Sequence, residues 1–519
     1  MLLVNNIKIP LDGDTKLATL DVCKQLRIPK EHIISCTLYR RSIDCRKKDN
    51  IHYVCSYLLE TKKEDYYLKK INFARKFENP IFNFEKQQSD VRPVVIGFGP
   101  AGMFAAYVLA LKGLRPIVFE RGMAVDERVG AVEKFMSGGE FNPKGNIQFG
   151  EGGAGTFSDG KLNTGITNPY CRFVLETFVE CGADEDVLID AKPHIGTDVL
   201  RTVVKNLRQK ILTLGGEIHF ESCLTKLNFE NDKLNKITVQ TDSGEKEFDC
   251  SYLLLAIGHS ARDTFRMLHD LAVPMQAKAF AIGSRIEHKQ KWLNEARYGK
   301  EKDLPAADYH LSTHLDDGRG VFTFCMCPGG EVVDARSDEN HIATNGMSNK
   351  GRDSENANSA LLVGVSPDEF GSGVLDGMLL QEKIEQAAYL YGKGHPISQT
   401  VGDFLNGKPS ATAGEVKPSV KPACTYGDIS SIFPQYITDA LKQGITELAK
   451  KLPGFDNPEA ILTAPETRSS SPVRILRDKT RQSAVLGLYP SGEGAGYAGG
   501  IMSAAVDGIE SALSLAEQI

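Results

Sequence analysis

Three glycines with a fixed spacing could bind a phosphate group. Gly97, Gly99 and Gly102 form a GxGxxG motif between an expected strand at 94–96 and an expected helix at 103–111. In this arrangement the first glycine permits a tight turn, the second lets the backbone approach a pyrophosphate, and the third allows the helix to pack closely on the strand. The helix N-terminus stabilises the anion. The segment predicts a dinucleotide site, with a purely structural glycine turn as the alternative.

An acidic residue ends the next expected strand, at 116–119. Glu120 lies about twenty residues beyond the glycines, where a carboxylate accepts hydrogen bonds from the adenosine ribose and repels a 2′-phosphate. FAD or NAD therefore fits better than NADP.

Three later segments favour FAD over NAD. The stretch 150–161 is too rich in glycine for the interior of a helix or strand, and it offers backbone N–H groups to a ligand. The stretch 253–259 is predicted to be a buried strand that ends in small residues, where the chain can pass beside a cofactor. The glycine-rich stretch 487–501 precedes an expected helix at 502–516, whose N-terminus would favour the anionic reduced flavin. No second GxGxxG is linked directly to an expected strand, so a permanent NAD domain is not predicted, while transient binding of NAD(P)H stays open.

Few catalytic side chains are expected, because hydride chemistry belongs to the flavin itself. Lys161 could stabilise a reduced flavin or an anionic substrate; the alternatives are a solvated lysine or a pyrophosphate contact. Glu493 could bind ribityl hydroxyls or substrate, or could only support a turn, and Tyr497 lies in the same segment. His194 and His259 could transfer protons near neutral pH, but a lone histidine is more often a structural hydrogen-bonding residue.

A pair of cysteines is a further candidate for redox chemistry. Cys325 and Cys327 are separated by one residue in the strand-like run 321–326. Because side chains alternate along a strand, both thiols are expected on one face, where they could be redox-active beside the flavin. Inert burial is the favoured alternative, since cysteines at i and i+2 form strained disulfides.

An α/β fold must position these residues. The predicted architecture is a doubly wound FAD-binding Rossmann-like domain with an inserted mixed α+β substrate or cap domain and a small N-terminal α/β domain. The expected boundaries are 1–85 for the N-terminal domain, 91–165 for the first part of the FAD-binding domain, 166–264 for its continuation with a β-hairpin, 265–478 for the inserted domain and 479–519 for the C-terminal part of the FAD-binding domain.

The periodicity predicts individual elements within these boundaries. They are strands at 2–9, 33–39, 51–59 and 217–221, a hairpin at 236–248, and helices at 15–26, 204–214 and 381–391.

The bulk properties exclude several classes of protein. The chain has 519 residues, a net charge of −6 and a pI near 6.1, so nucleic acid is an unfavourable partner and a small-molecule substrate is expected. The basic residues around Arg40 and Arg46 are better explained as a solvated hairpin face. A membrane span and a secretory signal are not predicted. Eleven scattered cysteines without a CxxC pair indicate reduced thiols in the cytoplasm and no metal site.

The motifs together resemble those of the two-domain FAD-dependent oxidoreductases. More narrowly, the runs GEGGAGTFSDGKL, AIGHSARDTF, FCMCPGG and GLYPSGEGAGYAGGI are similar to the bacterial family of uncharacterised FAD-dependent dehydrogenases, which carries a small N-terminal α/β domain. The resemblance implies FAD contacts at Gly97, Gly99, Gly102, Glu120, Arg121, Arg128, Ala154, Gly155, Thr156, Lys161, Thr225, Gly258, Gly492, Glu493 and Ile501. The predicted cofactor-binding set also includes Pro100, Ala101, Leu162, Ala256, Gly500 and Met502.

The expected function is an FAD-dependent oxidoreductase that transfers a hydride between the flavin and an organic substrate. A reductase or monooxygenase for isoprenoid or aromatic compounds is one alternative, and a non-catalytic redox-sensing flavoprotein is another. The fold alone does not choose among them, because such folds host many chemistries.

Overall fold

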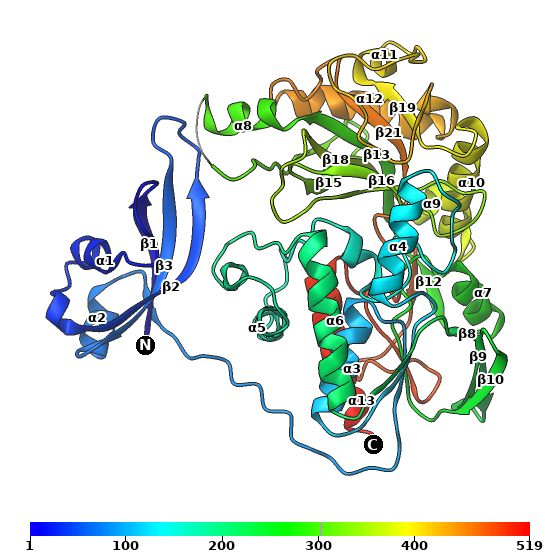
Figure 1. The fold of residues 1–519 in the computed structure, drawn as a ribbon, viewed down its shortest axis with the longest axis horizontal. Coiled ribbons are helices and arrows are strands. Elements are labelled where there is room, and N and C mark those ends of the chain that lie inside the picture. Colours follow the sequence, from blue (N-terminus) through cyan, green and yellow to red (C-terminus); the bar gives the residue numbers. More distant parts are fainter. Residues whose placement is uncertain (301–303) are drawn as a thin grey trace.

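A computed structural model describes residues 1–300 and 304–519 of the chain. Residues 301–303 fall within the predicted inserted domain and lie outside the described residues. The described chain contains a four-stranded sheet near the N-terminus, a five-stranded parallel sheet and a seven-stranded sheet (Figure 1). No helix among the described residues has both the length and the apolar character needed to cross a membrane.

The N-terminal module is an antiparallel sheet with two short helices. Its elements are β1 (Leu2–Pro10), α1 (Thr19–Leu26), β2 (Ile33–Asp44), β3 (His52–Thr61), α2 (Glu64–Lys70) and β4 (Ala74–Lys76). The strand order is β2-β3-β1-β4, and the short β4 is not predicted by the sequence pattern. The helix expected at 15–26 begins only at Thr19, because the Asp14 carboxylate accepts the backbone N–H groups of Lys16 and Leu17 and holds them in a turn.

The edge strand β2 docks this module on the rest of the chain. The backbone N–H of Arg41 donates to the carbonyl of Ile189, and the N–H of Ala191 donates back to the carbonyl of Arg41, both at 2.8 Å. The Arg41 guanidinium also pairs with Asp190 at 2.8 Å and with Asp186 at 3.2 Å. The basic hairpin thus binds acidic residues of the same chain.

Five short parallel strands carry the glycine motif. Their order is β23-β11-β5-β6-β7, so segments far apart in sequence lie side by side. Because the strands are parallel, their carboxyl ends meet at one edge, where ligands of open α/β sheets bind. The elements of this part are β5 (Val94–Ile96), α3 (Pro100–Leu111), β6 (Ile117–Phe119), α4 (Val125–Met136), α5 (Tyr170–Glu180), α6 (Thr197–Thr213), β7 (Glu217–His219), β8 (Cys223–Glu230), β9 (Lys233–Thr241), β10 (Gly244–Asp249), β11 (Leu253–Leu255), α7 (Arg262–Asp270), β23 (Leu488–Pro490) and α13 (Ile501–Ala516).

The two faces of the parallel sheet are covered differently. Val95 packs into a core shared with helices α3, α6 and α13, whereas its neighbours Val94 and Ile96 pack on the antiparallel sheet β10-β9-β8. Figure 1 shows these helices on one side of the sheet and β8–β10 on the other. The structure therefore corrects the prediction of a doubly wound domain. The predicted hairpin gains a third strand, and this small sheet covers the second face together with the single helix α7.

The second domain is built on a seven-stranded sheet of order β14-β15-β18-β13-β21-β19-β20. The two-stranded pair β12 (Met275–Ala277) and β22 (Val473–Ile475) marks where the chain enters and leaves it. The helix predicted at 381–391 begins earlier, at Asp376. The elements are β13 (Phe280–Lys289), α8 (Gln290–Tyr298), β14 (Ser312–His314), β15 (Gly320–Cys327), β16 (Glu331–Asp334), β17 (Thr344–Met347), β18 (Asn356–Val365), α9 (Pro367–Phe370), α10 (Asp376–Tyr391), β19 (Ile397–Thr400), α11 (Val401–Leu405), β20 (Thr425–Tyr426), α12 (Gln435–Ala449) and β21 (Ile461–Glu466).

A buried ionic cluster joins the two domains. Glu385 on α10 accepts two hydrogen bonds at 2.8 Å from Arg262, at the start of α7, and two at 2.8 and 3.1 Å from Arg468, which follows β21. Glu385 is fully buried. Burial alone would raise the pKa of Glu385, but the two guanidinium groups hold that pKa well below its ordinary value. The ion pair between Glu385 and Arg262 therefore crosses the domain junction, and Arg468, from the same domain as Glu385, adds a second positive charge.

Replacing Glu385 by glutamine should lower the free energy of unfolding by about 3–5 kcal/mol, because two buried guanidinium groups lose their counter-charge. Urea unfolding of the purified variant measures the change. The matched control is Glu447→Gln on α12, which breaks a surface pair with Lys450 and should cost less than about 1 kcal/mol. Equal losses for the two variants would contradict a supporting role for the buried cluster.

Candidate functional site

One cavity of about 510 Å³ lies where the carboxyl edge of the parallel sheet faces the second domain. A volume of this size is typical of cofactor and small-molecule sites. Many predicted site residues lie in its wall. These are Gly97, Gly99, Pro100, Ala101, Glu120, Arg121, Ala154, Gly155, Lys161, Ala256, Gly258, Cys325, Cys327, Glu493, Gly500 and Ile501.

The glycines of the GxGxxG motif meet different constraints. A Cβ atom on Gly97 would lie 2.3 Å from the carbonyl oxygen of Ala256, and one on Gly102 would lie 1.9 Å from that of Gly97. The fold itself therefore requires these two glycines. Gly99 differs, because a Cβ there would approach Gly153 no closer than 3.6 Å, and its backbone φ of −79° suits any residue. Gly99 lines the cavity directly before α3, so glycine at this position fits the close approach of a pyrophosphate.

Glu120 connects the backbone loops around the cavity. Its carboxylate accepts N–H groups from Phe98 at 2.7 Å and from Gly122 and Gly150 at 2.9 Å. A carboxylate offers about four acceptor positions, so these three bonds leave one for a ligand hydroxyl. Glu120 can thus hold the loops and still accept a hydrogen bond from a ribose.

Arg128 supports the same loops from behind. Its fully buried guanidinium donates to the carbonyls of Asn146, Ile147, Glu151 and Gly153 at 2.7–2.9 Å. Burial lowers the pKa of Arg128 to about 9. Arg128 was predicted to contact FAD, but the structure places it behind the cavity wall, where it shapes the glycine-rich loop.

Six other predicted cofactor contacts also lie outside the cavity wall. Thr156, Leu162 and Met502 are buried, and the Thr156 hydroxyl donates to the carbonyl of Glu151. Thr225 donates to the carbonyl of Thr238 within the β8–β9 pair. Cys223 and Leu224 of the same strand line the cavity instead. The remaining two are Gly102, which allows close helix packing, and Gly492, whose N–H donates to Asp507.

The C-terminal glycine segment forms another part of the wall. Asp507 accepts hydrogen bonds from the Gly492 N–H at 2.7 Å, from the Ser491 hydroxyl at 3.1 Å and from Arg477 at 2.6 Å. Gly500 and Ile501 line the cavity at the beginning of α13. The N-termini of two helices, α3 and α13, therefore adjoin the cavity, and both can stabilise negative charge there.

His259 and Glu493 come together in the cavity wall. His259 Nδ1 lies 3.5 Å from Glu493 Oε1, and His259 Nε2 is buried with no hydrogen-bond partner within residues 1–300 and 304–519. His194 does not line the cavity, and burial lowers its pKa. Tyr497 stacks on Arg477, whose guanidinium carbon lies 3.8 Å from the ring centroid, so its role is structural. The sequence analysis therefore proposed His259 and Glu493 separately but did not predict that they contact each other.

The two predicted redox cysteines do not share the geometry expected of them. The pairing of β15 with β18 shifts register between Phe324 and Cys327, and Cys325 has a φ of +41°. This bulge breaks the alternation, so both residues line the cavity but the Cys325 side chain is exposed there while Cys327 is buried. Burial among the cavity walls raises the pKa of Cys325 to about 12 and also raises the pKa of Cys327. The thiols stay protonated at neutral pH, which argues against nucleophilic or redox chemistry.

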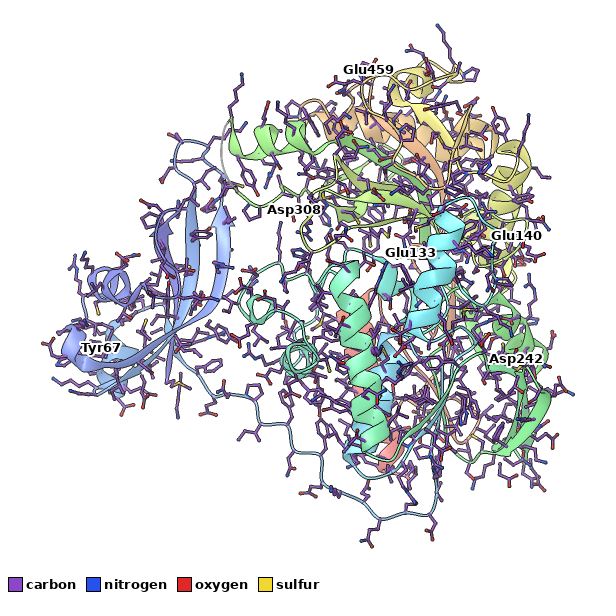
Figure 2. All side chains as sticks on the ribbon, viewed as in Figure 1. Tyr67, Glu133, Glu140, Asp242, Asp308 and Glu459 are labelled. Carbon is purple, nitrogen blue, oxygen red and sulfur yellow. The ribbon has the colours of Figure 1, made fainter. Side chains whose placement is uncertain are left out.

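Sequence reasoning named Cys325 and Cys327 but missed other residues that the second domain contributes to the cavity. Tyr309, Asn345, Glu466 and Arg468 line it, and Asp308 lies at its rim, paired with Lys192 at 2.7 Å. Figure 2 shows Asp308 where the second domain faces the N-terminal module. The available signal was a pair of charged residues, Glu466 and Arg468, directly after the largely apolar run 460–465.

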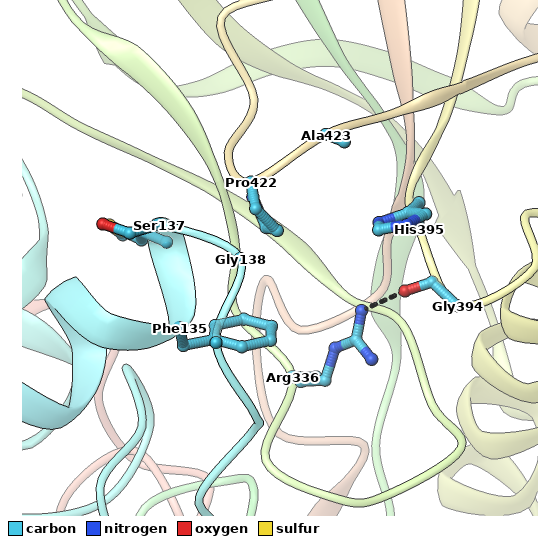
Figure 3. Close-up of a pocket in the computed structure, with 10 residues that line it drawn as sticks. Phe135, Ser137, Gly138, Arg336, Gly394, His395, Pro422 and Ala423 are labelled. Carbon is cyan, nitrogen blue, oxygen red and sulfur yellow. Dashed lines mark hydrogen bonds between the residues drawn. The ribbon is translucent and has the colours of Figure 1, made fainter.

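A second, smaller cavity of about 390 Å³ lies apart from these residues. Figure 3 shows Phe135, Arg336 and His395 around it, with Arg336 donating to the carbonyl of Gly394 at 2.7 Å. Arg336 is already paired with Asp334. None of the predicted site residues lines this cavity.

Comparison with known proteins supports the FAD-dependent family that the glycine motifs indicated. A Clostridium beijerinckii protein described as uncharacterized is 46% identical to this chain over 529 residues, which cover 99% of this chain and 98% of that protein. The family model for "FAD-dependent protein, C-terminal domain-like" matches residues 279–469. The chain belongs to this family of FAD-dependent proteins. A domain of unknown function matches residues 1–60, within the N-terminal module.

Solved structures that resemble this family member are distant. A flavin-dependent brominase has 14% identity and a TM-score of 0.36, with 82% of this chain and 78% of that chain covered. A geranylgeranyl bacteriochlorophyll reductase-like protein of Thermoplasma acidophilum has 12% identity and a TM-score of 0.36 at the same coverage. A flavoprotein/dehydrogenase of Cytophaga hutchinsonii has 13% identity and a TM-score of 0.33, again at 82% and 78% coverage. At these scores no conclusion about this chain follows from them.

The different constraints on Gly97, Gly99 and Gly102 give a direct test of the dinucleotide cradle, which is the loop 97–101 at the N-terminus of α3. Gly99→Ala should fold with a thermal midpoint close to that of the wild type, because the Cβ has room, yet bind FAD at least about tenfold more weakly. Fluorescence titration of the FAD-free protein with FAD measures the affinity. Gly130→Ala on α4, where a Cβ meets no atom within 4 Å, is the control and should bind FAD normally. Unchanged affinity in Gly99→Ala would contradict a pyrophosphate at this loop.

Proposed function

We propose that this protein is an FAD-dependent oxidoreductase that moves a hydride between the flavin and an organic substrate held between the two domains. The observation that carries the proposal is that the dinucleotide cradle and the sheet of the second domain form one continuous cavity. A merely structural glycine turn would not need a second domain placed over it. FAD, when bound, supplies the hydride chemistry.

The residues that would hold FAD come from four segments of the cavity wall. The loop 97–101 and the N-terminus of α3 would bind the pyrophosphate, and Glu120 would accept a ribose hydroxyl. The loop 150–155 and the segment 491–501 supply further backbone N–H groups around the same space. The donor set is therefore that expected for an anionic dinucleotide.

The chain's own side chains would tune charge and exclude water. The Lys161 ammonium lines the cavity and would stabilise negative charge on a reduced flavin or a substrate. Phe324, Met326 and Tyr309 of the second domain cover the cavity with largely apolar surface, which strengthens such interactions by keeping water out.

A nicotinamide cofactor would act here only as a transient donor. The GxGxxG pattern recurs at 150–155 and 494–499, but neither copy directly follows a strand, both segments adjoin the same cavity, and that cavity would already hold the FAD. NAD(P)H would then bind, reduce the flavin and leave before the second substrate enters.

The purified protein should carry FAD, and an anaerobic titration with NADH and then NADPH should bleach the visible absorption band of the oxidised flavin with one of them. Bleaching within seconds identifies a reductase and its donor. A flavin that stays oxidised with both nucleotides indicates an enzyme that oxidises its own substrate. The absence of flavin from the protein, together with no binding of added FAD, would contradict the proposed function.

A further inference from the structure

A carboxyl group without a hydrogen-bond partner faces the cavity from the second domain. Glu466 ends β21, a strand in which every residue is buried, and the glutamate itself is 3% exposed. Its side chain lines the cavity, and its Oε2 atom has no hydrogen-bond partner in the described part of the chain. A buried carboxylate oxygen left without a partner, in a residue that lines a cavity, calls for an explanation such as a ligand group.

The groups that face Glu466 come from β13, β15 and β17. The Thr344 hydroxyl on β17 acts to lower the pKa of Glu466 and donates to the carbonyl of Pro465 at 2.9 Å. Nη1 of Arg285 on β13 lies 3.7 Å from Glu466 Oε1, too far for a hydrogen bond. The other arm of Arg285 is occupied, because Nη2 donates to the carbonyl of Cys325 at 3.0 Å and to Asn358. The thiols of Cys325 and Cys327 on β15 are protonated and carry no charge near neutral pH.

Two other polar residues of the cavity wall already have hydrogen-bond partners. Arg468 is held by Glu385, and Tyr309 shares a hydrogen bond of 2.9 Å with Ser359. Glu466 therefore has one charged neighbour, Arg285, which offsets its burial only in part. Burial raises the pKa of Glu466 to about 7 in spite of Arg285. A carboxyl group with this property exists in both protonation states at neutral pH, as a general acid or base requires.

We infer that Glu466 is the acid–base group for a neutral organic substrate in this cavity, an inference that rests on the proposed function. Oxidation of a neutral alcohol or amine removes a hydride from carbon and one proton from oxygen or nitrogen, and a C=O or C=N bond forms. The Glu466 carboxylate takes up that proton, and in the reverse reduction the carboxyl group returns it. Proton and electron-pair counts balance, with the hydride assigned to the flavin.

The surroundings of Glu466 select the charge of this substrate. An anionic group placed next to Glu466 would be repelled whenever the glutamate is ionised, whereas a neutral group would not be. Among the other carboxylates of the cavity, Asp159 accepts from Arg352 at 3.0 Å, Asp308 accepts from Lys192 at 2.7 Å and Glu120 accepts three backbone N–H groups, while Glu493 lies 3.5 Å from His259. Although burial acts in the opposite direction, Lys192 holds the pKa of Asp308 below its ordinary value. Glu466 is thus better suited than these residues to exchange a proton with a bound neutral molecule.

Labelling with dicyclohexylcarbodiimide tests the inference without a known substrate. The O–H of a protonated carboxyl group adds across one C=N bond of the reagent, and the product rearranges to a stable N-acylurea that retains the full mass of the reagent. The holoprotein is labelled between pH 5 and 9 and the modified peptide is measured by mass spectrometry. Labelling at Glu466 should fall about tenfold per pH unit above about 7.

Two controls make the result specific to this carboxyl group. Glu466→Gln should abolish the modified peptide while its FAD content stays that of the wild type, and Asp308 should stay unlabelled throughout this pH range. If Glu466→Gln does not fold, the pH dependence in the wild type still decides. No label on Glu466 at any pH, or equal labelling at pH 6 and pH 9, would overturn the inference. FAD content is read from the same samples, so loss of FAD with normal labelling contradicts the proposed function instead.

Discussion

The Glu120 carboxylate accepts backbone N–H groups from three separate loops, and the shape of the cavity depends on this interaction. Phe98, Gly122 and Gly150 donate to it from segments that the parallel sheet brings to one edge. Arg128 completes the arrangement by donating to four carbonyls of the loop around Gly150. The charged side chains of Glu120 and Arg128 thus provide hydrogen-bond partners for buried backbone groups that would otherwise have none. The inner side of the loops is left free for a ligand.

The second domain converts this edge into a cavity between the two domains. Its sheet lies over the carboxyl edge, and the buried cluster of Glu385, Arg262 and Arg468 fixes the two domains to each other. Arg468 takes part in the cluster and also lines the cavity, so domain contact and cavity wall share a residue. The same wall carries Glu466, which places a titratable group opposite the cofactor cradle.

The sequence predicted the parts of this arrangement that local rules govern. The strand, glycine turn and helix at 94–111 and the late glycine segment before α13 follow from φ requirements and helix start signals, and the structure has them at those positions. Non-local packing was harder to predict. The antiparallel sheet on the second face of the parallel sheet depends on pairing between β8 and β9, which the hairpin pattern alone did not indicate.

The candidate site was predictable to a similar extent. The glycines that would contact a cofactor through their backbone were predicted from residue type and spacing. Arg128 and Thr225 were instead carried over from a family resemblance, and they lie outside the cavity wall. The bulge at Cys325 defeated the alternation rule, because a single residue at positive φ changes which face a side chain takes. Glu466 was missed since its distinctive surroundings come from β13 and β15, far away in sequence.

Hydrogen–deuterium exchange with and without FAD tests most directly whether the cofactor occupies this cavity. Adding FAD should slow exchange in four segments of the wall, residues 97–103, 120–124, 150–156 and 491–501. Slowed exchange in all four would establish the cradle as the binding site. Unchanged exchange in these segments, or protection confined to the smaller cavity around Arg336, would contradict the account.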